Sequence, residues 1–211
     1  LKSLFEINSP HAKHPQLLAN LIFAEENELN QCMKAVIEQG KSIVPSLIAL
    51  LKSDSFHDPL YPGYGQAPTH AAYCLGKIGY SQAIIPLFEG IGQGDPYQDD
   101  TLISALIHLG EESKTFIIQQ LQSRPISQDN IRAAMVTSGF SEDPVIQSIR
   151  LNELQTDEVL KNETLLSYLI MPCHELKEES QRLLFRCLTQ RENFPSKLKE
   201  EVEAIIQSWS I

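Results

Sequence analysis

Apolar residues recur at intervals of three, four and seven positions along most of this chain, with polar residues between them. This spacing is typical of helices that bury one face, and the alternation that marks a half-buried strand is almost absent. The pattern therefore predicts an all-α protein. The clearest stripes run through residues 71–78, 84–91 and 102–109, and the longest ends the chain with Leu198, Val202, Ile205, Ile206 and Trp209.

Glycines interrupt these stripes at a regular spacing. Gly40, Gly79, Gly110 and Gly139 each follow an apolar segment and precede a short polar turn. A glycine adopts the left-handed backbone at the end of a helix without steric cost, and we expect these four to do so. Repetition at a period of about 30 residues is typical of stacked helical hairpins.

The repetition predicts one domain over residues 1–211. We expect a right-handed α–α superhelix, or solenoid, of about five helical hairpins. A helix at about 196–209 should cap the array, because its outer face is charged. The chain begins with Leu1 instead of methionine, which suggests a fragment of a longer protein.

An insertion at about 54–67, rich in proline, glycine and tyrosine, breaks the helical pattern and is predicted to form a loop. Long loops in compact domains are often functional. His57 and Asp58 could act as an acid and base pair if a third group oriented them. Tyr61 and Tyr64 could hold a flat or apolar partner, or these aromatic rings could fold back over the hairpin ends as local packing.

Two clusters contain atoms that can bind a metal. His70 and Cys74 lie four residues apart on one predicted helix and face the same side, but two ligands do not complete a site. A histidine packed beside a cysteine at a hairpin interface is the favoured interpretation. His174 and Glu175 follow Cys173 directly, and Glu175 is explained as a residue that stabilises a helix start. We predict neither a metal nor another cofactor.

The four cysteines are widely spaced and form no CxxC pair, which predicts reduced, buried thiols in a cytoplasmic protein. The formal net charge of −10 argues against binding to nucleic acid or to an anionic membrane surface. No apolar run approaches the length of about 20 residues that spans a bilayer. The common signatures of hydrolases, nucleotide-binding proteins and zinc proteases are missing as well.

The segment 67–91 contains an ordered set of alanine, leucine, isoleucine, glycine and proline positions, namely Ala72, Leu75-Gly76, Ile78-Gly79, Ala83-Ile84, Pro86 and Leu87. With this order it resembles a HEAT-type repeat of the short bacterial kind, which also occurs in phycobilin lyase-like proteins. Residues 40–54 and 99–124 resemble it more weakly, and beyond about residue 155 only helical periodicity remains. The resemblance implies an array that binds other proteins along a concave face, lined by the second helix of each pair.

Enzymes with this architecture provide an alternative. Deoxyhypusine hydroxylase-like proteins hold two irons with several His-Glu pairs, whereas this chain has His70-Ala71 at the similar position and one His-Glu dipeptide, at 174–175. That activity is therefore disfavoured, and no motif tests the lyase resemblance.

The sequence favours a non-catalytic scaffold that binds a protein or peptide. The alternative is a metal- or small-ligand-dependent enzyme, lyase- or hydroxylase-like, with a site near the 54–70 loop. Candidate binding residues on the loop and the second helices are His57, Tyr61, Tyr64, His70, Glu89, Gln93, Gln119, Gln120, Gln147 and Arg150.

Overall fold

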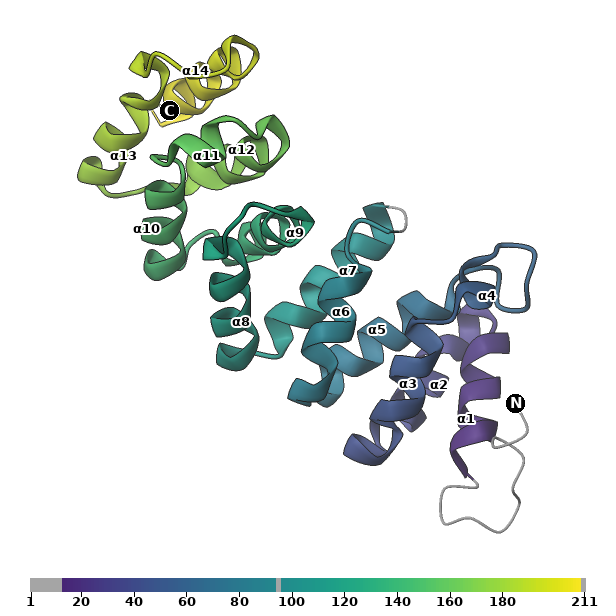
Figure 1. Ribbon diagram of the computed structural model, residues 1–211. Coiled ribbons are helices and arrows are strands. Elements are labelled where there is room, and N and C mark those ends of the chain that lie inside the picture. Colours follow the sequence, from purple (N-terminus) through teal and green to yellow (C-terminus); the bar gives the residue numbers. More distant parts are fainter. Residues whose placement is uncertain (1–12, 94–95, 210–211) are drawn as a thin grey trace. The chain divides into compact units, whose positions relative to one another are not determined.

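The computed structural model describes residues 13–93 and 96–209 (Figure 1). Throughout these residues the secondary structure is helical and contains no strand, which confirms the all-α prediction. The chain divides into two compact units, one ending at Ser113 and the other beginning at Lys114. None of the helices from α1 to α14 is long and apolar enough to cross a membrane.

The first unit is built from helices that each contact the next helices along the chain. α1 packs on α2, α2 on α5, α3 on both α5 and α6, and α7 on both α5 and α6. The helices are α1 (Lys13–Phe23), α2 (Glu26–Ile37), α3 (Val44–Leu51), α4 (Asp54–His57), α5 (Ala67–Ile78), α6 (Ile84–Gly90) and α7 (Pro96–His108). Short 3-10 helices, Gly40–Ile43 and Ser81–Ala83, precede α3 and α6.

The left-handed turns predicted at Gly40, Gly79 and Gly110 are confirmed in this unit. Gly79 follows α5 with a φ of 70° and donates its N–H to the Leu75 carbonyl, and Gly40 and Gly110 also have positive φ. Gly139 differs, because it lies within a 3-10 helix, Ser138–Phe140, and is not among the described glycines with positive φ. The prediction of a left-handed turn there is wrong, since the chain continues from α9 in right-handed 3-10 conformation.

α5 and α7 form the most extensive helix contact in the first unit. Gly76 is buried in the last turn of α5, and a Cβ atom built on it would lie 2.7 Å from the Cα of Ala105 and 2.8 Å from its Cβ. Real Cβ contacts do not come this close, so the missing side chain lets the two backbones approach. The conformational cost of a glycine inside a helix, about 1 kcal/mol, is offset by this contact.

The second unit repeats the neighbour-to-neighbour packing. α9 packs on α12, α10 on α13, and α13 on α14. The helices are α8 (Glu111–Gln122), which begins just before the unit boundary, α9 (Gln128–Thr137), α10 (Pro144–Glu153), α11 (Asp157–Leu160), α12 (Glu163–Ile170), α13 (Glu179–Arg186) and α14 (Lys199–Ser208). Further 3-10 helices span Met171–Glu175, Leu188–Gln190 and Ser196–Leu198. The predicted C-terminal helix is thus present, as a 3-10 turn followed by α14.

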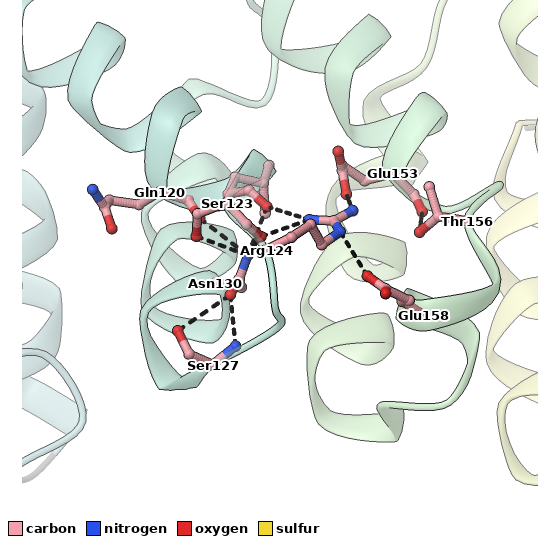
Figure 2. A network of polar contacts seen from close by, with 9 residues as sticks. Gln120, Ser123, Arg124, Ser127, Asn130, Glu153, Thr156 and Glu158 are labelled. Atoms are coloured by element: carbon pink, nitrogen blue, oxygen red, sulfur yellow. Dashed lines mark hydrogen bonds and ion pairs between the residues drawn. The ribbon is translucent and has the colours of Figure 1, made fainter.

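Polar contacts join the turn after α8 to α9 and α10 (Figure 2). The Asn130 side chain donates to the carbonyl oxygens of Gln120, Leu121 and Ser123, and accepts from the backbone N–H of Ser127. These bonds satisfy carbonyl groups that the end of α8 would otherwise leave unpaired. Arg124 extends the network by pairing with Glu153 at 2.5 Å and with Glu158 at 2.9 Å.

Asp143 begins α10 and pairs with Lys114. Its carboxylate accepts the N–H groups of Val145 (2.9 Å) and Ile146 (3.1 Å) and lies 2.5 Å from the Lys114 ammonium. Burial acts to raise the pKa of Asp143, but the hydrogen bonds from Lys114 and from the two backbone groups outweigh it, and the pKa lies below the usual 3.8. This stabilisation is therefore present above pH 3.8 and is lost as the pH falls through the lower pKa of the folded state.

Asp143→Asn is expected to lower the free energy of unfolding at neutral pH by about 1 kcal/mol. Asparagine still caps the helix, so the loss reports the missing charge opposite Lys114. Urea unfolding at a series of pH values measures the difference from wild type, which should shrink as the pH falls below 3.8. Glu142→Gln is the matched control, because the Glu142–Lys177 pair is largely exposed and contributes little. A difference that stays constant down to low pH would contradict the role assigned to the Asp143 carboxylate.

Candidate functional site

The insertion after α3 is a chain of hydrogen-bonded turns. It opens with the single helical turn α4, so the prediction of a segment without helical structure is wrong at its start. Backbone bonds then follow from Tyr61 N to Asp58 O (2.9 Å), from Tyr64 N to Tyr61 O (3.0 Å) and from Gln66 N to Gly63 O (2.9 Å). The backbone of this segment, residues 53–66 and hereafter the insertion loop, is therefore extensively bonded to itself.

His57 and Asp58 support the loop by bonding to backbone. The Nε2 atom of His57 lies 3.0 Å from the carbonyl oxygen of Leu51, at the end of α3. The Asp58 carboxylate accepts the N–H of Leu60 at 2.8 Å and so forms an Asx turn. No bond joins the two side chains, and each is engaged with the main chain. The structure does not assemble them as an acid and base pair.

The aromatic residues of the loop divide between the two roles that the sequence left open. Phe56 and Tyr61 form an edge-to-face pair with ring centroids 5.2 Å apart, which is local packing. Tyr64 points outward and is 82% exposed, and Leu60 is 95% exposed. The loop therefore presents an apolar side chain and a phenol to solvent on a hydrogen-bonded base.

The backbone at Tyr64 is held in an unfavourable conformation. Among the described residues other than glycine, Tyr64 alone has a positive φ, 53°. This conformation costs roughly 1–2 kcal/mol. Both neighbours are glycines in close contact. A Cβ on Gly63 would lie 3.0 Å from the Ile22 carbonyl oxygen in α1, and one on Gly65 would lie 3.0 Å from that of His57. Close packing on both sides fixes the direction in which Tyr64 projects.

Cys74 lies inside the first unit and His70 beside it is partly buried, which agrees with the packed interpretation. Cys74 is buried, and burial raises the pKa of its thiol to about 12. The Nδ1 atom of His70 is buried and has no hydrogen-bond partner, and burial lowers the pKa of the imidazole below 6.5. Among residues 13–93 and 96–209, no group of three or more histidine, cysteine or acidic side chains is placed to hold a metal ion.

The lowered pKa of His70 predicts a pH-dependent stability. Between the two pKa values the unfolded chain binds more protons than the folded one, so this stabilisation is complete above pH 6.5 and is lost as the pH falls. We expect wild type to lose more unfolding free energy than His70→Gln between pH 7.5 and pH 5.5, as urea titrations would measure. His174→Gln, at a half-exposed histidine, should behave as wild type. Parallel profiles for wild type and His70→Gln would contradict the prediction.

The candidates on the second helices separate into exposed and buried groups. Glu89 and Gln93 are exposed, with Glu89 paired to Lys52 at 2.7 Å. Gln119 is exposed and Gln120 is partly buried, both on α8. Gln147 and Arg150 are buried, so the expectation that they line an exposed surface is wrong.

Gln147 and Arg150 bond to main chain inside the second unit. Gln147 donates to the Ser141 carbonyl at 2.8 Å, and Arg150 donates to the Thr137 carbonyl at the end of α9, also at 2.8 Å. Both side chains lie on the face of α10 that carries Ile146 and Leu151, which are buried as well. Their role in this structure is to satisfy interior carbonyl groups.

The prediction of buried thiols holds for only part of the set. All four cysteines are free, and Cys74 and Cys173 are buried. Cys32 is partly exposed and Cys187, at the end of α13, is exposed. Burial was therefore wrongly predicted for Cys187, whose position just past the last turn of the helix leaves it outside the packed face.

The sequence did not predict a groove that the structure shows between α5 and α7. This groove has a volume of about 220 Å³. α5 contributes Tyr73 and Lys77, and α7 contributes Asp100, Ser104 and His108. The spacing signals such a face, because Tyr73 and Lys77 are four residues apart and the three α7 residues follow at successive intervals of four. Nothing in the sequence, however, paired these two helices.

Neither a known protein family nor a curated protein significantly matches this chain.

Proposed function

We propose that this protein is a non-catalytic scaffold that binds another protein or a peptide, and that the insertion loop is its recognition element. The observation that carries the proposal is the exposure of Leu60 and Tyr64, at 95% and 82%, on a backbone held by its own turns. A rigid aromatic side chain and a neighbouring aliphatic one supply contact area at low cost in conformational entropy.

The bonding within the loop supports recognition over catalysis. His57 and Asp58 are committed to main-chain groups, and Leu60 and Tyr64 are the most exposed of the large apolar side chains in the loop. The backbone strain at Tyr64 also supports a role for its direction. Such strain persists where surrounding packing fixes it, and it clusters at ligand-binding segments.

We further propose that the helices form a HEAT-like array of stacked hairpins. Packing in the first unit supports this, because α5 and α7, the first helices of adjacent hairpins, contact each other, and so do the second helices α3 and α6. In the second unit the corresponding pairs are α9 with α12 and α10 with α13. Stacked hairpins leave long surfaces and connecting loops available to a partner.

The test is a double variant, Leu60→Ser with Tyr64→Gly. Glycine adopts the left-handed backbone at residue 64 without strain, so the variant removes the recognition side chains while the fold keeps its stability or gains some. Chemical crosslinking in extracts of the native cells, followed by affinity purification and quantitative mass spectrometry, compares the partners of wild type and variant. We expect the bound partner to fall at least about tenfold, since an aromatic hot spot contributes 2 kcal/mol or more.

Tyr97→Asn is the matched control, because Tyr97 is a tyrosine of the same unit that is 68% exposed but lies on α7. The control should retain the partners of wild type. If the double variant and wild type capture the same proteins in equal amounts, the insertion loop is not the recognition element.

A further inference from the structure

We propose that the groove between α5 and α7 is a second binding site, which takes a carboxylate group through Lys77. The groove lies on first helices of adjacent hairpins and shares no residue with the insertion loop. This inference goes beyond the proposed function, because it assigns a chemical class of ligand to a different surface of the first unit and does not depend on the loop.

Lys77 is held in place by neutral groups. Its ammonium lies 3.0 Å from Nε2 of His108 and 5.6 Å from the centre of the Tyr73 ring. Nδ1 of His108 lies 2.8 Å from the Ser104 carbonyl oxygen, so Nδ1 carries the proton and Nε2 accepts from Lys77. One of the three ammonium N–H groups is thus used, and the other two remain available to a ligand.

Lys77 contacts no acid among the described residues, although acidic residues are in excess in this chain. Acidic residues outnumber Lys and Arg by 27 to 17, and many of the basic side chains that the structure describes form ion pairs, Lys52, Lys114, Arg124 and Lys177 among them. Lys77 forms none with any described side chain. A histidine and a tyrosine, not a carboxylate, contact the cation at the groove.

The size and charge of the groove favour a carboxylate. A volume of about 220 Å³ suits a small group and is below the range of about 300–1,000 Å³ typical of drug-sized ligands. The Ser104 hydroxyl lines the same groove and can donate to a second oxygen. Asp100 lines it too, and its negative charge opposes a doubly charged phosphate more strongly than a singly charged carboxylate.

Titrations followed by NMR test this assignment on the full chain. The probes are acetate, the capped tripeptide acetyl-Gly-Glu-Gly-amide, its glutamine analogue and inorganic phosphate, and the readouts are the His108 ring and the backbone amides of residues 73–77 and 104–108. We expect acetate and the glutamate peptide to bind with a dissociation constant on the order of 1 mM. The glutamine analogue should bind at least about tenfold more weakly, because a neutral amide gains no charge-assisted hydrogen bond. Tighter binding of the peptide than of acetate assigns the natural source to an acidic side chain, and equal binding assigns it to a small free carboxylate.

Two substitutions complete the design. Lys77→Gln should weaken binding of both carboxylates at least about tenfold. Lys41→Gln is the matched control with the same change in net charge, because Lys41 also lies over a tyrosine ring, that of Tyr80 at 4.7 Å, but outside the groove. Equal shifts with the glutamine analogue, unchanged binding by Lys77→Gln, or tighter binding of phosphate would each overturn the assignment.

Discussion

Gly76→Ala is expected to lower the free energy of unfolding by about 2 kcal/mol, because the new methyl group would enter the tight contact between α5 and α7. The Cβ would lie 2.7 Å from the Cα of Ala105, and a backbone atom cannot rotate away as a side chain can. Overpacking of this kind costs up to about 3 kcal/mol, and the better helix propensity of alanine returns about 1 kcal/mol. Urea unfolding followed by circular dichroism measures the net loss.

Gly90→Ala is the matched control. Gly90 is also helical, as the last residue of α6, but a Cβ there would meet the Leu102 Cδ1 atom at 3.3 Å, the far end of a flexible side chain. We expect this variant to change stability by less than about 1 kcal/mol. Ala105→Gly added to Gly76→Ala should recover part of the loss, since it removes one of the two clashing atoms. Equal losses for Gly76→Ala and Gly90→Ala would contradict a tight α5–α7 crossing.

If the hairpins stack as proposed, the effect of Gly76→Ala should also remain local. In an array each hairpin contacts only its neighbours, so a damaged contact weakens the adjoining helices first. Hydrogen exchange should then accelerate in α5, α7 and the helices of the first unit that contact them, namely α1, α2, α3, α4 and α6. Uniform acceleration throughout residues 114–211 as well would argue for one shared core instead of an array.

The helical elements could be predicted because periodicity and glycine punctuation are local properties. The stripe at 71–78 falls within α5, and Gly79 ends that helix as its missing side chain allows. Gly139 was misjudged because the same residue type also fits a 3-10 continuation, and the choice between them depends on tertiary packing. The groove at Lys77 was missed for a related reason, since no local pattern says which face of one helix meets which face of another.

Polarity was a poor guide to exposure in α10. Gln147 and Arg150 were assigned to an open surface because they are polar, yet Arg150 follows Ile146 by four residues and shares its buried face. Helical register therefore contained the information, and residue type concealed it. In the insertion loop, by contrast, the local sequence did not contain the information about exposure. The direction of Tyr64 depends on the left-handed backbone at residues 63–65, where Gly63 packs against Ile22 of α1, and no local pattern in the sequence indicates that contact.

The second large effect is expected at Arg150, where removal of the buried charge should raise the free energy of unfolding. The side chain is fully buried, only Nη2 has a hydrogen-bond partner, the Thr137 carbonyl, and Nε and Nη1 have none. Burial accordingly lowers the pKa of the guanidinium. An arginine in this state loses its hydration without a carboxylate to replace it, which is costly.

Arg150→Met is therefore expected to raise the free energy of unfolding by about 1–3 kcal/mol. Methionine fills most of the same space with a flexible apolar chain, and the cost of leaving the Thr137 carbonyl unpaired, about 1 kcal/mol, is smaller than the desolvation that is relieved. Arg150→Ala should instead destabilise by about 3 kcal/mol, because it removes the charge but leaves a cavity. Urea unfolding of wild type and the two variants at neutral pH separates the cost of burying the charge from the cost of leaving a cavity. A methionine variant less stable than wild type would show that the guanidinium is satisfied in solution, by internal water at Nε and Nη1, and that its burial is not a source of instability.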